Sequence, residues 1–207
     1  MKCILGTKQK MTQVFDDLGN AYPATVISAG PVKVIQVKTK ATDGYDAIQV
    51  GFGEQKESRI NKAQIGHAKG LGNFRFVQEF RVSADVVASA KAGDTIDLGS
   101  FAVGDRVTIS SKSKGKGFQG VVKRHHFKGG SRTHGQKHSE REPGTISGGG
   151  GRAGGRVAKG MRMAGRMGGD NVTVKNLKVL QVHKDTNELV LEGSLPGVRG
   201  VLVTIQG

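Results

Sequence analysis

Short apolar runs separated by turn residues dominate the first part of the chain. The runs are rich in Val and Ile, and they lie at 3–6, 11–15, 24–27, 32–37 and 47–52. Between them stand Asp-Leu-Gly-Asn, Gly-Pro and Asp-Gly, which are strong turn signals. Runs of this length and composition, punctuated in this way, are typical of antiparallel β-strands.

The same pattern returns later in the chain, after polar interruptions. Further strands are predicted at 74–82, 106–109, 171–182, 189–192 and 201–205. A short helix is expected near 62–69, with Asn61 as its N-cap. Many short strands, little helix and glycine-rich turns favour a mainly β fold built on a β-barrel.

The strand groups at the two ends of the chain are expected to share one barrel, since neither is large enough to enclose a core. The expected parts are the barrel at 1–53, 98–112 and 169–207, a small α+β subdomain at 54–97, and a long basic, glycine-rich internal extension at 113–168. The extension is set apart by its composition, because it lacks the apolar periodicity of its flanks.

The distribution of charge supports the separation of the extension from the rest of the chain. The 207 residues carry a net charge of +15, and the window 111–170 holds 14 Lys and Arg against three acids. The same window contains 17 of the 33 glycines but only two aromatic residues. Such a segment buries too little apolar surface to offset its ordering entropy, so we expect a mobile arm when it is alone. Its charge predicts a polyanionic partner, most often a nucleic acid.

Composition also excludes several classes of protein. A single cysteine, Cys3, rules out a disulfide framework and a cysteine-based zinc site. No apolar run reaches the length of a membrane span, and the run 3–5 is too short for a signal peptide. We therefore expect a soluble intracellular protein.

Two motifs in the basic window permit alternative interpretations. Gly115–Gly120 spells the dinucleotide fingerprint, but the segment that follows is basic rather than a second apolar strand, so a tight turn approaching RNA is favoured. His134 and His138 have helical metal-ligand spacing, yet Gly135 lies between them and no third ligand is evident. No metal and no cofactor are therefore predicted.

Candidate catalytic groups are poor as well. Glu140 and Glu142 lie beside arginines that would keep them ionised, which suits ion pairs better than acid catalysis. Cys3 lies in an apolar run and is expected in the core rather than as a nucleophile. We therefore expect a protein without enzymatic activity.

Arginine spaced by glycine is the most unusual feature of the window, at 144–156 and again at 159–169. Glycine allows close backbone approach, and the Arg guanidinium binds phosphate and stacks on bases. The predicted RNA-binding residues are basic residues and histidines of the window 111–170. They are Lys112, Lys114, Lys116, Lys123, Arg124, His125, Lys128, Arg132, His134, Lys137, His138, Arg141, Arg152, Arg156, Lys159, Arg162 and Arg166.

Several blocks of the chain resemble one known family. Ser113–Arg124 (SKGKGFQGVVKR) is similar to the signature of the universal ribosomal protein uL3 family of the large subunit. Further blocks agree in order and extend the resemblance over nearly the whole chain. They are Gly6–Lys8, Met11–Gln13, Asp43–Tyr45, Thr133–Gly135, Pro143–Ile146, Met163–Gly168 and Val172–Val174.

The resemblance implies a translation-protein-like β-barrel anchored on large-subunit rRNA (23S), with the basic loop directed toward the peptidyl-transferase region. It also implies a role in early subunit assembly and contacts with neighbouring ribosomal proteins such as L-fourteen and L-nineteen, without homo-oligomers. The length suits the bacterial or organellar type, so the resemblance implies a place in a cytoplasmic ribosome, with an organellar ribosome as the alternative. The positions that match the family lie at the base of the loop and along it. By this resemblance the base holds Lys114, Lys116, Lys123 and Arg124, and the loop holds His134, Arg152, Arg156, Arg162 and Arg166.

Two other classes remain open from the residues alone. One is an enzyme on a flavin-reductase-like barrel, in which Gly115–Gly120 would hold a phosphate. The other is a DNA-architectural protein, because a basic arm is also compatible with duplex DNA.

Overall fold

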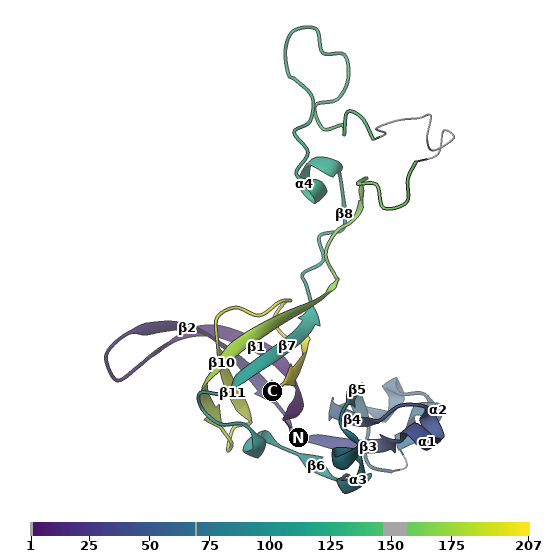
Figure 1. Cartoon of the computed structure of the whole chain (residues 1–207), viewed down its shortest axis with the longest axis vertical. Coiled ribbons are helices and arrows are strands. Elements are labelled where there is room, and N and C mark those ends of the chain that lie inside the picture. The colour runs from purple at the N-terminus through teal and green to yellow at the C-terminus, as the bar shows by residue number, and fades with distance from the viewer. Residues whose placement is uncertain (1, 69, 147–156) are drawn as a thin grey trace. The chain divides into compact units, whose positions relative to one another are not determined.

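The computed structural model describes residues 2–68, 70–146 and 157–207 (Figure 1). Its contacts divide the chain into two compact units. We call Met1–Lys112 together with Asn171–Gly207 the body, and Ser113–Asp170 the basic arm. No helix in the described ranges is long and apolar enough to cross a membrane.

A closed antiparallel barrel forms the larger part of the body, with strand order β1-β12-β7-β10-β11-β2 (Figure 1). Its strands are β1 (Cys3–Phe15), β2 (Ala21–Ala29), β7 (Arg106–Lys112), β10 (Asn171–His183), β11 (Glu188–Glu192) and β12 (Leu202–Gln206). The predicted mainly β fold is confirmed, and strands from both ends of the chain share the barrel. The segments at 3–6 and 11–15 form one strand, whose register shifts between Lys8 and Met11.

Alternation along the strands fills the barrel. In β7, Val107, Ile109 and Ser111 are buried, while the residues between them are more exposed. Strand β12 continues the layer with Val203 and Ile205, and Ile205 lies opposite Ile109. Period-two burial of β-branched residues is what a barrel wall requires, because one face packs inward and the other faces outward.

A second antiparallel sheet has the order β5-β4-β3-β6. Its strands are β3 (Val32–Lys38), β4 (Ala47–Glu54), β5 (Phe74–Arg81) and β6 (Thr95–Ile96). The assignment of all of residues 1–53 to the barrel was therefore wrong, because β3 and β4 pair with β5 and β6. The alternation of a strand predicts which of its faces is buried, but it does not specify which strand it pairs with.

Short helices complete the body: α1 (Lys40–Asp43), α2 (Lys62–Ala68) and α3 (Ala84–Ser89), with 3₁₀ turns at Glu57–Arg59 and Leu98–Ser100. The predicted helix is α2, and the Asn61 side chain accepts a hydrogen bond from the Gln64 N–H at 2.8 Å, as an N-cap does. One hydrophobic cluster joins the barrel to the second sheet, since Ile4 and Leu191 share it with Val50 and Phe80.

Candidate nucleic-acid interface

Two short strands give the basic arm its described backbone framework. Strand β8 (Phe118–Gln119) pairs with β9 (Gly165–Arg166), so that Phe118 lies opposite Arg166. Below this pair the Lys116 N–H donates to the Met167 carbonyl, and the Met167 N–H donates to the Gly117 carbonyl, both at 2.9 Å. Residues separated by about fifty positions are thus held side by side by main-chain hydrogen bonds, independently of any side-chain core.

Gly168 permits the close approach of these two backbone segments. Its φ is +74°, and a Cβ atom there would overlap the carbonyl oxygen of Lys114. Gly129 plays a similar part farther along the arm, with φ +79° against the carbonyl oxygen of Glu140. Only glycine satisfies both requirements, the left-handed backbone and the absence of a side chain.

The described residues of the arm form two limbs, 113–146 and 157–170. A short helix, α4 (Val121–His125), follows β8 in the first limb and contacts the second. Arg124 donates from Nη1 to the Met163 carbonyl at 2.6 Å, and a ring nitrogen of His125 lies 3.1 Å from the same oxygen. Val121, on the same helix, is the one buried hydrophobic residue among the described residues of the arm. Arg124 and His125 are half-buried. Their contacts with the Met163 carbonyl hold this segment against α4.

The other predicted RNA-binding residues that the structure describes are exposed. They are Lys112, Lys114, Lys116, Lys123, Lys128, Arg132, His134, Lys137, His138, Arg141, Lys159, Arg162 and Arg166. Lys112 ends β7 and belongs to the body, whereas the others lie in the arm. Arg152 and Arg156 lie outside the described residues.

Acidic groups do little to neutralise this surface. Arg132 Nε donates to Glu140 Oε2 at 2.8 Å, and this is the one ion pair between described residues of the arm. The expected structural role of Glu140 is thereby confirmed, with Arg132 as its partner. An exposed surface with so few compensating carboxylates keeps a strong positive potential, which attracts polyanions.

The histidines of the arm are not arranged as a metal site. No group of three His, Cys, Asp or Glu side chains comes together in the described ranges. His134 has a φ of +62° and lies outside any helix, so the spacing to His138 does not place the two rings on one helical face. Helical spacing is informative only where a helix forms.

The glycine motif Gly115–Gly120 also differs from a nucleotide-binding loop. Its last residues form β8 and the N-cap of α4, and α4 has only five residues. A dinucleotide fingerprint joins a strand directly to a long helix whose N-terminus faces the pyrophosphate. Here Gly117 has a left-handed φ of +66° and its carbonyl accepts a hydrogen bond from the Met167 N–H, so this glycine serves the pairing of the two limbs instead.

Cys3 is buried in β1 at the barrel wall, as its apolar neighbours predicted. Burial raises the pKa of its thiol to about 12. A thiol with such a pKa is protonated at neutral pH, and the thiolate is the nucleophilic form. Cys3 therefore acts as a core residue.

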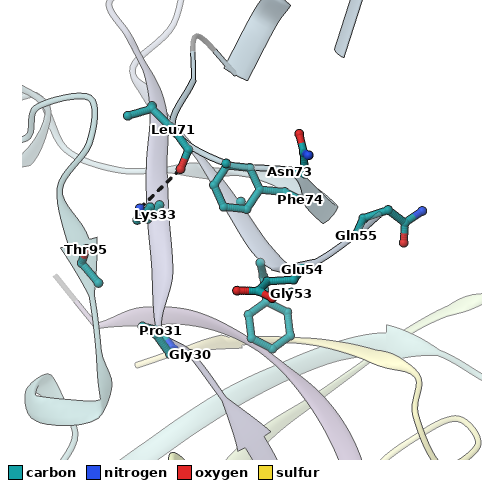
Figure 2. A pocket seen from close by; sticks show the side chains of 13 residues that line it. Gly30, Pro31, Lys33, Gly53, Glu54, Gln55, Leu71, Asn73, Phe74 and Thr95 are labelled. Atoms are coloured by element: carbon teal, nitrogen blue, oxygen red, sulfur yellow. Dashed lines mark hydrogen bonds between the residues drawn. The ribbon is translucent and has the colours of Figure 1, made fainter. Parts of the chain in front are cut away.

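A cavity of about 530 Å³ opens in the body beside the second sheet (Figure 2). Lys33 Nζ donates across it to the Leu71 carbonyl at 3.3 Å, and Glu54 also lines it. These are the two ionisable groups among its described lining residues. The Phe74 ring covers Gly51, where a Cβ would overlap the ring. The cavity lacks the convergent titratable groups that acid–base chemistry needs.

Phe118 is absent from the predicted set, although the structure exposes 76% of its surface within the basic arm. The one signal in the sequence was its position between Gly117 and Gln119 in a lysine-rich motif. Because aromatic residues are usually buried, the sequence did not indicate that this ring is exposed.

Comparison with known proteins gives consistent matches to one family. A family model described as ribosomal protein L3 matches residues 54–195. The large ribosomal subunit protein uL3 of Desulfotalea psychrophila is 50% identical over 205 residues, which cover 98% of this chain and 96% of that protein. The uL3 protein of Herpetosiphon aurantiacus is 46% identical over 98% of this chain and 94% of its own length. That of Chlorobium limicola is 45% identical over 99% and 98%.

Proposed function

The chain belongs to the ribosomal protein L3 family, and from this membership we propose that it is a structural, non-enzymatic constituent of the large ribosomal subunit. The relatives that match over nearly their whole length are named as proteins of that subunit. The alignments span the body and the basic arm alike, so the proposal concerns the whole chain.

Within the subunit, the basic arm binds large-subunit rRNA. The observation that carries this proposal is the row of exposed cationic side chains on an arm with a single ion pair among its described residues. Phosphate contacts release condensed counterions, so each contact adds affinity that falls with salt. The arm buries little apolar surface of its own, so we expect contacts with RNA to stabilise its folded conformation.

Three finer roles follow from the family membership and belong to the same proposal. The arm extends toward the peptidyl-transferase region, the chain takes part in early subunit assembly, and its protein neighbours include L-fourteen and L-nineteen. Met161 and Met163, which are 39% and 37% exposed, suit adaptable packing between RNA helices. Specificity comes from RNA shape rather than from base edges in a duplex.

The test compares the full chain with two variants in binding to large-subunit rRNA over a range of salt concentrations. One variant lacks residues 113–168, and the other replaces Lys114, Lys116, Lys123 and Arg166 with Gln. We expect the substituted chain to bind more weakly, with a salt slope reduced by about 3 from the loss of four phosphate contacts. The deletion is expected to lose most of the affinity.

Unchanged affinity and salt slope in both variants would overturn the role of the arm. Equal competition by duplex DNA would favour the architectural alternative instead. Migration of the full chain with the large subunit through a high-salt sucrose gradient tests the coarser assignment, and migration free of RNA would contradict it.

A further inference from the structure

We propose that Phe118 is a stacking platform for an unpaired nucleobase of single-stranded RNA. This inference rests on the proposed RNA-binding function and names a ligand group for one position of the arm. It differs from the phosphate contacts proposed above, because stacking needs a base rather than a charge.

The exposure of Phe118 is the first observation. The ring-bearing residue is 76% exposed, whereas Phe52, Phe80 and Phe101 are at least nine-tenths buried. Phe15, at 60%, is the other strongly exposed phenylalanine. Exposing a large apolar ring costs free energy that a partner recovers, so an isolated exposed ring on a positively charged segment points to a ligand with an apolar face.

The charge around Phe118 identifies the ligand class. Lys116 precedes it by two residues, and Arg166 lies directly opposite it on β9. All three residues are exposed. The Arg166 guanidinium lies over Gly169, where a Cβ would overlap it. An exposed aromatic residue with cationic residues near it in the chain and opposite it on the paired strand matches a nucleotide, whose phosphate is negatively charged and whose base has a π-face.

Hydrogen bonds hold the backbone at Phe118 although most of its surface is exposed. Strand pairing with β9 holds it on one side, and the Gln119 side chain donates to the Lys116 carbonyl across the preceding turn. On the other side, Gly120 caps α4 and Val121 is buried. A platform held in this way loses little conformational entropy when a base stacks on it, which favours affinity.

The chain lacks tryptophan, which permits a direct test. In the full chain, Phe118→Trp places a single fluorophore at the site while retaining an aromatic face. The probes are a short oligoadenylate, an abasic oligomer with the same number of phosphates, and a duplex RNA of equal length. We expect oligoadenylate to quench the Trp emission, and the abasic strand and the duplex to leave it unchanged.

The matched control is Phe15→Trp, because Phe15 is exposed but is followed by Asp16 and Asp17. Its emission is expected to be insensitive to all three probes. Phe118→Leu, with folding verified by circular dichroism, is expected to weaken oligoadenylate binding by about 5- to 150-fold, as loss of one stacked base implies. Phe118→Tyr is expected to retain the affinity.

The outcomes separate this inference from the function on which it rests. Oligoadenylate binding without quenching, or with unchanged affinity in Phe118→Leu, overturns the platform and leaves RNA binding intact. Equal quenching by the abasic strand also overturns it, since no base is then required. Failure of the unsubstituted chain to bind rRNA at all would instead overturn the proposed function.

Discussion

The body and the basic arm achieve order by different means. The barrel closes on itself and buries residues such as Ile4 and Leu191 completely. The described part of the arm buries one hydrophobic side chain, Val121, and relies on two short strands and on left-handed glycines. Burial of apolar surface is the main stabilising contribution in folded proteins, so the body can be stable alone.

The difference shows which interactions stabilise each region. Main-chain hydrogen bonds between exposed strands contribute modestly, because water competes for the same groups. The backbone of the arm therefore has a defined geometry but is only weakly stabilised by the protein itself. Its cationic side chains would allow a bound polyanion to stabilise it further. Under the proposed function, stability and RNA recognition lie in separate parts of one chain.

The largest effect is expected from a cavity in the barrel. Leu191→Ala removes a fully buried side chain of β11, and we expect it to lower the free energy of unfolding by about 2–5 kcal/mol. Chemical denaturation followed by circular dichroism measures this. Val172→Ala, at a 37% exposed position of β10, is the control and is expected to change stability by less than about 0.5 kcal/mol. A comparable loss of body stability in Val121→Ala would break the contrast between the two regions.

An intermediate effect is expected from the glycine that brings the arm's limbs together. Gly168→Ala introduces a strained φ and an overlap with Lys114, at a cost of about 1–3 kcal/mol confined to the arm. Hydrogen exchange at the Lys116 and Met167 amides is expected to accelerate, while the denaturation midpoint of the body stays unchanged. Gly115→Ala is the control, because its φ is not left-handed and no atom lies near. Equal exchange in the two variants would show that the close approach is unimportant.

The smallest effect is expected from an ion pair on the second sheet. Lys38 Nζ lies 2.7 Å from Glu79 Oε1, and the Tyr45 hydroxyl donates to Oε2 at 2.8 Å. Hydrogen bonds from Lys38 and then Tyr45 hold the pKa of Glu79 below its ordinary value of 4.5. The folded state thus binds this proton less readily than the unfolded state, so the stabilisation is present above pH 4.5 and is lost as the pH falls through the lowered pKa.

Glu79→Gln is therefore expected to lower the melting temperature slightly at pH 7, as for a surface ion pair, and to match the unsubstituted chain at strongly acidic pH. Thermal melts across this pH range measure the difference. A difference that persists undiminished at the acidic end would assign the effect to packing rather than to charge.

Local pattern predicted much of the fold. The alternation in 106–109 predicted β7, and the apolar run at 189–192 predicted β11. Such patterns are informative because they reflect which side chains of the segment are buried. The pairing of β4 with β5 and of β3 with β6 was not predictable in the same way, because the residue pattern of a strand does not identify its partner. Helix α3 was missed because its short apolar pattern, with Val87 buried, is ambiguous between helix and loop.

The candidate site likewise has features that the sequence predicts and features that it does not. Its cationic composition is a property of the sequence, so the exposed lysines and arginines could be named from it. The contacts of Arg124 and His125 with Met163 join positions far apart in the chain and required the structure. Phe118 was missed for a related reason: Phe127 lies in the same basic segment but is half-buried, and the basic neighbours that both rings have do not show which ring is exposed.

Strand β12 lies between β1 and β7 in the barrel, although it is the last of the three in the chain. Without it, β1 and β7 would each present an unpaired edge, and the barrel would be an open sheet. Because synthesis proceeds from the N-terminus, the basic arm leaves the ribosome that makes it before the barrel can close. The chain therefore passes through a stage in which its cationic segment is complete and its core is not.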